Sequence, residues 1–176
     1  MKKSFRAFLG WSVLVQCAVS SCAAPADQAV PEQICGVSVS SRLTRSLLTS
    51  KDDLREFSRV DRAEAVTAPC MLQSGEHAVL GLRFAWDDAP TDLMYLAGSR
   101  VSRIAEPHAV PFPFKTIVGN DGAISQTPCK TRGGRYFTLT LQLPQVRLGD
   151  RGRRADIEAF MRAYFPATVA TLGCGT

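Results

Sequence analysis

Two segments of this chain repeat one pattern, and the repeat limits the folds that the sequence can adopt. Each begins with a Pro-Cys pair, Pro69-Cys70 in the first segment and Pro128-Cys129 in the second. A turn-forming stretch containing a glycine comes next, followed by a run in which apolar residues recur at every second position. The recurring apolar residues are Leu80, Leu82 and Phe84 in the first copy and Leu139, Leu141 and Leu143 in the second. The pattern predicts two matched β-hairpins, each with its cysteine on the first strand. A chance likeness between two unrelated hairpins is the alternative.

Segments whose apolar residues are spaced as in a helix flank these hairpins. Leu43, Leu47 and Leu48 lie one turn apart after Ser40 and Ser41, either of which could cap a short helix. Asp52 could cap a further turn that carries Leu54 and Phe57. The segment 90–92 has the composition of a helix start, and Gly98 is placed to end that helix.

The longest predicted helix runs from about Arg154 to Leu172. Its apolar stripe and its proline are read directly from the sequence: Ile157, Phe160, Met161, Tyr164 and Pro166. Because proline lacks a backbone N–H donor, Pro166 is expected to kink or divide the helix. Together, hairpins and helices predict an α+β fold, with an antiparallel sheet and helices packed on it.

Four of the six cysteines belong to this domain, namely Cys35, Cys70, Cys129 and Cys174. An even set in an exported chain predicts two disulfides with three possible connectivities. The economical arrangement ties each flanking helical segment to its nearest hairpin, as Cys35–Cys70 and Cys129–Cys174. Pairing Cys70 with Cys129 across neighbouring strands is the alternative. The cysteine spacing does not favour a metal site, and the sequence indicates no cofactor.

The N-terminus has the layout of a secretory signal. A basic stretch with Lys2, Lys3 and Arg6 precedes an apolar run, which ends in Val19-Ser20-Ser21-Cys22. Those last four residues are similar to a bacterial lipobox, in which the cysteine is acylated after cleavage. The sequence therefore predicts a signal peptide at 1–21, a lipidated Cys22 with a flexible tether at 22–32, and one extracytoplasmic domain at 33–176.

Two alternatives exist for this segment. Cleavage by ordinary signal peptidase near Ala23 or Ala24 would release a soluble protein. A permanent membrane-spanning helix is disfavoured, because the apolar run of about 13 residues falls short of the roughly 20 that a hydrocarbon core requires.

Charge gives little indication of a partner. The formal net charge of +5 includes Lys2, Lys3 and Arg6, so the part after Cys22 carries an excess of only two positive charges. Neither this balance nor the expected location favours nucleic acid. The basic run Arg147, Arg151, Arg153 and Arg154 could lie against anionic lipid headgroups, although a solvated loop is the simpler interpretation.

The chain resembles small exported lipoproteins of actinobacteria, and a related arrangement is similar to the extracellular sensor domains of some actinobacterial Ser/Thr kinases. The matching parts are Gln33-Ile34-Cys35-Gly36, Ala68-Pro69-Cys70, Val118-Gly119 with Pro128-Cys129, and Ala155 to Cys174. This resemblance implies an α+β fold and a role in the cell envelope, and it implies no catalytic residues.

No nucleophile elbow, phosphate loop, zinc-binding helix motif or dinucleotide fingerprint occurs in the sequence. Three features could supply catalytic or metal-binding groups, and each has a simpler structural interpretation. They are the acidic loop with Asp87, Asp88 and Asp92, the histidines His77 and His108, and the carboxylate pairs Glu76 with Glu106 and Asp61 with Glu64.

Phe112 and Phe114 are the candidate binding residues. They alternate with prolines in the segment 107–114, which stiffen an extended chain and lower the ordering cost of recognition. An edge strand that packs both rings into the core is the alternative.

We therefore expect a non-enzymatic envelope lipoprotein, anchored to the membrane through lipid, that binds a protein partner or a small envelope ligand. The alternative is a cell-wall hydrolase or an accessory subunit of an envelope enzyme.

Overall fold

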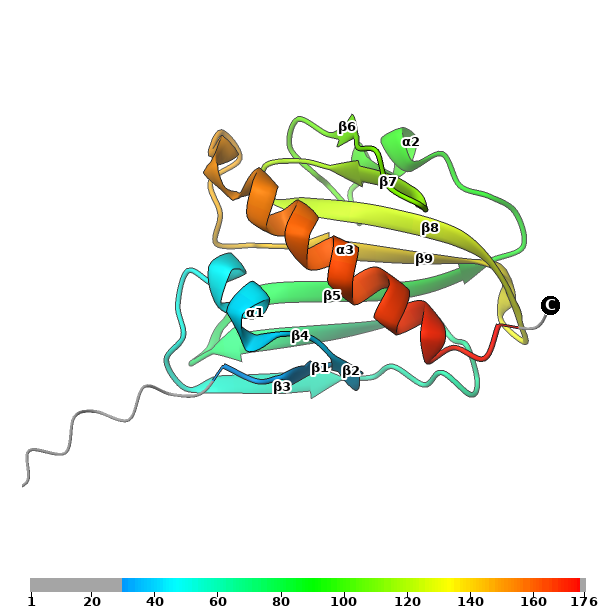
Figure 1. Cartoon of the computed structure of the whole chain (residues 1–176), viewed down its shortest axis with the longest axis horizontal. Coiled ribbons are helices and arrows are strands. Elements are labelled where there is room, and N and C mark those ends of the chain that lie inside the picture. Colours follow the sequence, from blue (N-terminus) through cyan, green and yellow to red (C-terminus); the bar gives the residue numbers. More distant parts are fainter. Residues whose placement is uncertain (1–29, 175–176) are drawn as a thin grey trace, which may run out of the picture.

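The computed structural model describes residues 30–174, and its main feature is a seven-stranded antiparallel sheet (Figure 1). The predicted signal peptide, Cys22 and most of the tether lie outside the described residues. The strand order is β3-β4-β5-β9-β8-β7-β6. From one edge to the other the strands are β3 Leu54–Ser58, β4 Ala68–Ser74, β5 His77–Asp87, β9 Gly134–Gln142, β8 Gly122–Thr131, β7 Lys115–Val118 and β6 His108–Ala109.

The two matched hairpins are confirmed as β4–β5 and β8–β9, with Cys70 and Cys129 on their first strands. They lie side by side at the centre of the sheet, where β5 pairs with β9 and Phe84 is opposite Leu139. The predicted alternating positions are all buried, as expected for strands that present one face to a core.

One long helix, α3 (Arg154–Ala170), lies across this apolar face (Figure 1). Its predicted stripe is buried, and Phe165 stacks on Phe137 of the sheet with ring centroids 6.0 Å apart. The short helix α1 (Ser41–Leu47) packs beside α3, and the small hairpin of β1 (Gln33–Ile34) and β2 (Val37–Ser38) completes the layer. The prediction of an α+β fold with helices packed on an antiparallel sheet is confirmed.

Both disulfides have the predicted connectivity, Cys35–Cys70 and Cys129–Cys174. The first joins the β1–β2 hairpin to β4, and the second joins the end of α3 to β8. The alternative Cys70–Cys129 pairing fails because β5 and β9 separate the two strands. At about 4.8 Å between neighbouring strands, the two cysteines are roughly 14 Å apart across the sheet. A disulfide requires Cα atoms within about 7 Å.

Two local predictions were wrong, and a third was correct only in the position of the N-cap residue. The segment after Asp52 forms the edge strand β3 and not a helical turn, because β4 offers it a row of backbone partners while its own side chains are largely exposed. Pro166 does not divide α3, which is one helix of 17 residues held to the sheet on both sides of the proline by buried Phe165 and Thr168. Ser40 precedes α1, yet its side chain makes no capping hydrogen bond.

The second face of the sheet is covered only in part. Helix α2 (Leu93–Ala97) begins as predicted, with the Asp92 carboxylate accepting from the backbone N–H groups of Met94 and Tyr95. It packs on β7 and β8 through a separate small core made up of Leu93, Ala97, Ile104, Ile117 and Ile124. Within residues 30–174, no helix is long and apolar enough to cross a membrane.

Candidate binding site

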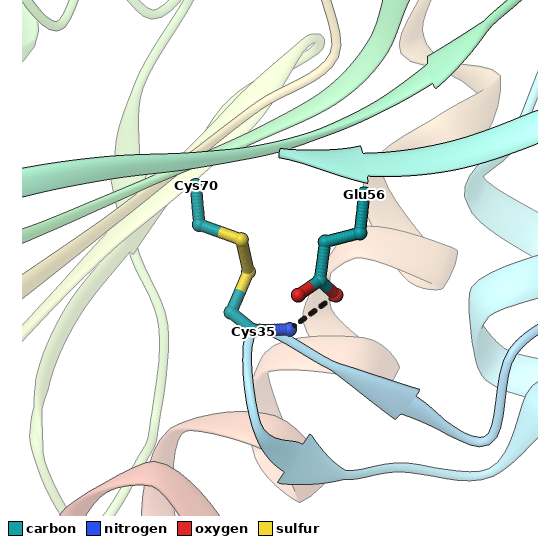
Figure 2. A group of neighbouring side chains, drawn as sticks. All are labelled: Cys35, Glu56 and Cys70. Carbon is teal, nitrogen blue, oxygen red and sulfur yellow. Dashed lines mark hydrogen bonds between the residues drawn. A yellow bond between two sulfur atoms is a disulfide. The ribbon is translucent and has the colours of Figure 1, made fainter. Parts of the chain in front are cut away.

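The first cluster of chemically interesting groups surrounds a disulfide (Figure 2). Ligand-type atoms of Cys35, Glu56 and Cys70 lie within 4.8 Å of one another, a grouping that could suggest a metal. However, metals bind the thiolate form of cysteine, and here the two sulfurs are bonded to each other. The Glu56 carboxylate accepts a hydrogen bond of 2.7 Å from the backbone N–H of Cys35. This cluster is therefore a structural connection between β1 and β3.

Other side chains fix the same connection. The Arg62 guanidinium donates to the backbone oxygen of Cys35 and lies 5.3 Å from the centre of the Phe84 ring. The hydroxyl of Tyr164 donates to the Ile34 oxygen at 2.9 Å. Burial raises the pKa of Tyr164 far above its usual range, so this hydroxyl keeps its proton and remains a donor. The cluster stabilises the N-terminal hairpin against α3.

The predicted binding residues Phe112 and Phe114 are half-buried and pack against the main core. The Phe114 ring meets Phe165 of α3 edge-on, with centroids 5.0 Å apart, and the Arg162 guanidinium lies 5.0 Å from the centre of the Phe112 ring. Their segment connects β6 to β7. The structure therefore brings these rings to the side of α3, and a binding role for them stays a prediction.

The other candidate catalytic and metal-binding residues are exposed, and some of them have structural partners. The Asp61 carboxylate accepts from the N–H groups of Ala63 and Glu64. His77 and His108 are exposed on strands β5 and β6. The hydrogen bond from Arg151 lowers the pKa of Glu106, and the nearby charge of Arg154 adds to this effect.

Most of the basic run is held within the protein. Arg151 and Arg154 both pair with Glu106, at 2.7 and 2.8 Å. Arg154 also donates to the side chain of Asn120, and Arg153 donates to the backbone oxygen of Ser46. These contacts join the start of α3 to the loops around it, so three of the four arginines have partners.

A different set of residues meets on the partly covered face of the sheet. The positions that alternate with the core of β5 and β9 point to this face, and three register pairs form its floor. The pairs are Gly81 with Gln142, Arg83 with Thr140, and Ala85 with Thr138. Helix α2 packs mainly on β7 and β8, and among its residues Leu96 borders this floor.

The segment after α2 forms a wall beside the floor and makes it concave. Floor and wall together form two adjoining depressions, of about 330 Å³ and about 240 Å³, which we together call the sheet hollow. The larger depression lies over Arg83, Ala85 and Asp87 of β5, and its wall includes Leu96 of α2 and, after that helix, Ser99, Val101 and Ser102. The smaller depression extends over Gly81 and Met71 and shares Arg83 and Val101 with the larger one. The larger volume falls within the range of roughly 300–1,000 Å³ that is common for small-molecule sites.

Hydrogen bonds connect floor and wall. The Gln126 amide donates to the Thr138 hydroxyl at 2.8 Å and accepts from the Thr91 N–H at 3.2 Å. The Gln142 amide donates to the backbone oxygen of Arg103 at 3.4 Å. The hollow is thus formed by the folded structure and does not require a side chain to move away.

Several polar groups of the hollow have no partner among residues 30–174. The Arg83 guanidinium makes no hydrogen bond or ion pair with this part of the chain. Arg83 is exposed and lines both depressions. The hydroxyl of Thr140 also makes none, and although the residue is 3% exposed, its hydroxyl oxygen is not fully buried. Such a group gains free energy from a hydrogen bond that a ligand or water supplies.

The sheet hollow was not predicted from the sequence, although the sequence does show which residues of β5 face it. The alternation that identified Leu80, Leu82 and Phe84 as core also places Gly81, Arg83 and Ala85 on the opposite face. Nothing in the sequence shows that this face is left uncovered or that a wall stands beside it.

Comparison with known proteins returns no relative. No family model matches the sequence, and neither the curated proteins nor the solved structures contain a match.

Proposed function

We propose that this protein is an exported, lipid-anchored binding protein of the cell envelope, and that it acts without catalysis. Its sheet hollow is the observation that carries this proposal. A preformed concavity with an arginine and a hydroxyl that have no partner among the described residues suits recognition of a ligand. Of the catalytic and metal-binding candidates that the sequence offers, Asp87 alone is among the described residues that line the hollow.

The location rests on two features that agree with each other. All four cysteines between residues 30 and 174 are paired in disulfides, which persist outside the cytoplasm. The N-terminal sequence ends in Val19-Ser20-Ser21-Cys22, which resembles a lipobox. In this proposal Cys22 carries the acyl chains and holds the domain on the extracytoplasmic face, as in the actinobacterial lipoproteins that the chain resembles.

The anchor is tested by replacing single cysteines in the full chain. Cys22→Ser should abolish incorporation of a palmitate analogue in a bacterial host and move the protein from the membrane fraction to the soluble fraction. Cys17→Ser, which changes a cysteine within the apolar run, is the matched control and should keep both label and membrane association. Unchanged labelling of Cys22→Ser would overturn the lipid anchor.

A further inference from the structure

We infer that the sheet hollow binds a small organic anion with an apolar body, and that Arg83 receives the anionic group. This inference rests on the proposed binding function and deepens it by assigning the class of ligand. It follows from the charge, the apolar surface and the glycine of the hollow.

Charge favours an anion. Arg83 is the only cation among the residues that line the hollow in the described part of the chain, and its guanidinium has no internal partner. The wall segment adds two exposed arginines, Arg100 and Arg103, on either side of Val101 and Ser102. A guanidinium presents a planar fork of donors that matches carboxylate, sulfonate and phosphate oxygens. The nearby hydroxyl of Thr140, opposite Arg83 on β9, can donate a further hydrogen bond.

One acidic residue lies at the far end of the hollow. Asp87 is four residues from Arg83 on the same strand, which corresponds to roughly 13 Å at about 3.3 Å per residue. This is the spacing of the two backbones, and both side chains line the larger depression, so an anionic group is favoured at the Arg83 end only, where salt screens its repulsion by the exposed Asp87 carboxylate.

The surfaces on both sides of Arg83 are apolar enough for the body of such a ligand. Val101, which is 56% exposed, borders both depressions. Leu96 and Ala85 lie on one side of the hollow, and Met71 and Pro69 line the adjoining depression. A ligand without an apolar part would not bury these apolar side chains.

Gly81 provides a separate argument. A Cβ atom added at this glycine would meet only the backbone oxygen of Gln142, at 3.9 Å, so packing does not require glycine there. By contrast, a Cβ at Gly122, on β8 of the same sheet, would lie 2.2 Å from the Leu141 oxygen. Glycine inside a strand weakens it and often marks a bulge, a tight bend, or a site where a ligand or another backbone approaches closely. At Gly81 it leaves the floor open beside Arg83.

The test uses two fluorescent probes that share an anilinonaphthalene body and differ in charge. 8-Anilinonaphthalene-1-sulfonate carries a sulfonate, and N-phenyl-1-naphthylamine carries none. Both are titrated into the full-length Cys22→Ser chain and into the same chain with one further change. Arg83→Gln removes the cation, Gly81→Leu fills the floor, and Arg42→Gln on α1 is the control for loss of a positive charge on the opposite layer.

We expect Arg83→Gln to lower the affinity for the sulfonate probe at least tenfold and to change the affinity for the uncharged probe less than twofold. Gly81→Leu should weaken both probes at least tenfold, and Arg42→Gln should change neither. If Arg83→Gln does not change the affinity for the sulfonate probe while Gly81→Leu abolishes binding, the assignment of an anionic ligand is wrong and the proposed binding function stands. If Gly81→Leu leaves both probes unaffected, the hollow is not a binding site, and the proposed function loses its main support. Thermal unfolding of each variant confirms that it is folded.

Discussion

The two faces of the central sheet are built from the same strands and have opposite roles. On the α3 face, residues such as Phe84 and Leu139 are wholly buried beneath a helix, and both disulfides lie within that core. On the other face, the adjacent residues Arg83 and Thr140 line a hollow, because α2 packs mainly on β7 and β8 and borders the hollow with Leu96. Stability is therefore concentrated on one face, which leaves the other free to carry polar groups without internal partners.

Substitution of neighbouring residues on β5 gives the largest expected difference between the faces. Phe84→Ala should lower the free energy of unfolding by about 3–5 kcal/mol, because it removes a buried ring and leaves a cavity. Arg83→Ala should change it by about 0.5 kcal/mol or less, as is usual for an exposed residue. Urea denaturation of both variants measures the contrast. Equal losses would show that the hollow face also stabilises the fold.

Removal of a disulfide tests whether the covered face depends on its cross-links. Replacing Cys129 and Cys174 with alanine frees the end of α3 from β8 and opens a loop with a sequence separation of 45 residues. A loop of that length predicts a loss of roughly 4 kcal/mol by chain entropy. The Cys35→Ala, Cys70→Ala pair, with a separation of 35, should lose a similar amount.

Denaturation midpoints of the two double variants provide this measurement, with Cys17→Ala as the control. A variant that unfolds at the same midpoint as the parent chain would show that α3 is held by packing alone.

The smallest expected effect concerns the ion pairs of Glu106. Glu106, which follows the wall segment, pairs with Arg151 and with Arg154 at the start of α3. Because these contacts lower the pKa of Glu106 from its ordinary value of 4.5, the folded state favours the carboxylate. The stabilisation is present above that value and is lost as the pH falls through the lowered pKa.

Melting temperatures measured between pH 7 and pH 3 check this sign. Glu106→Gln should melt below the parent chain at pH 7, and the difference should shrink towards pH 3. Glu76→Gln, at the exposed β4–β5 turn, should melt like the parent throughout. A difference for Glu106→Gln that grows on acidification would contradict the assignment.

Local patterns in the sequence were sufficient for most of the covered face. The alternation in both hairpins, the stripe of α3 and the pairing of the four cysteines were predicted correctly, since each depends on spacing along the chain. Errors arose where a distant segment decided the outcome. The residues after Asp52 form a strand because β4 supplies partners, and α3 continues through Pro166 because the sheet holds both sides of it.

The candidate binding residues also differ in whether local sequence or distant contacts identify them. Phe112 and Phe114 were chosen from composition, yet their rings lie against α3, and no spacing in the sequence indicates that contact. Arg83 was overlooked because a lone arginine on a strand is ordinary; its significance comes from Gly81, Thr140 and the wall segment around it.

The sequence by itself determined which residues of each strand share a face, which cysteines can pair within a short reach, and the N-terminal pattern that predicts export and lipid attachment. These properties follow from periods of two and 3.6 residues and from short motifs. Only the tertiary structure decided that β5 and β9 are neighbours and that α2 stops short of them. Strand order and helix coverage depend on contacts between residues far apart in the chain, and those contacts create the sheet hollow at Arg83.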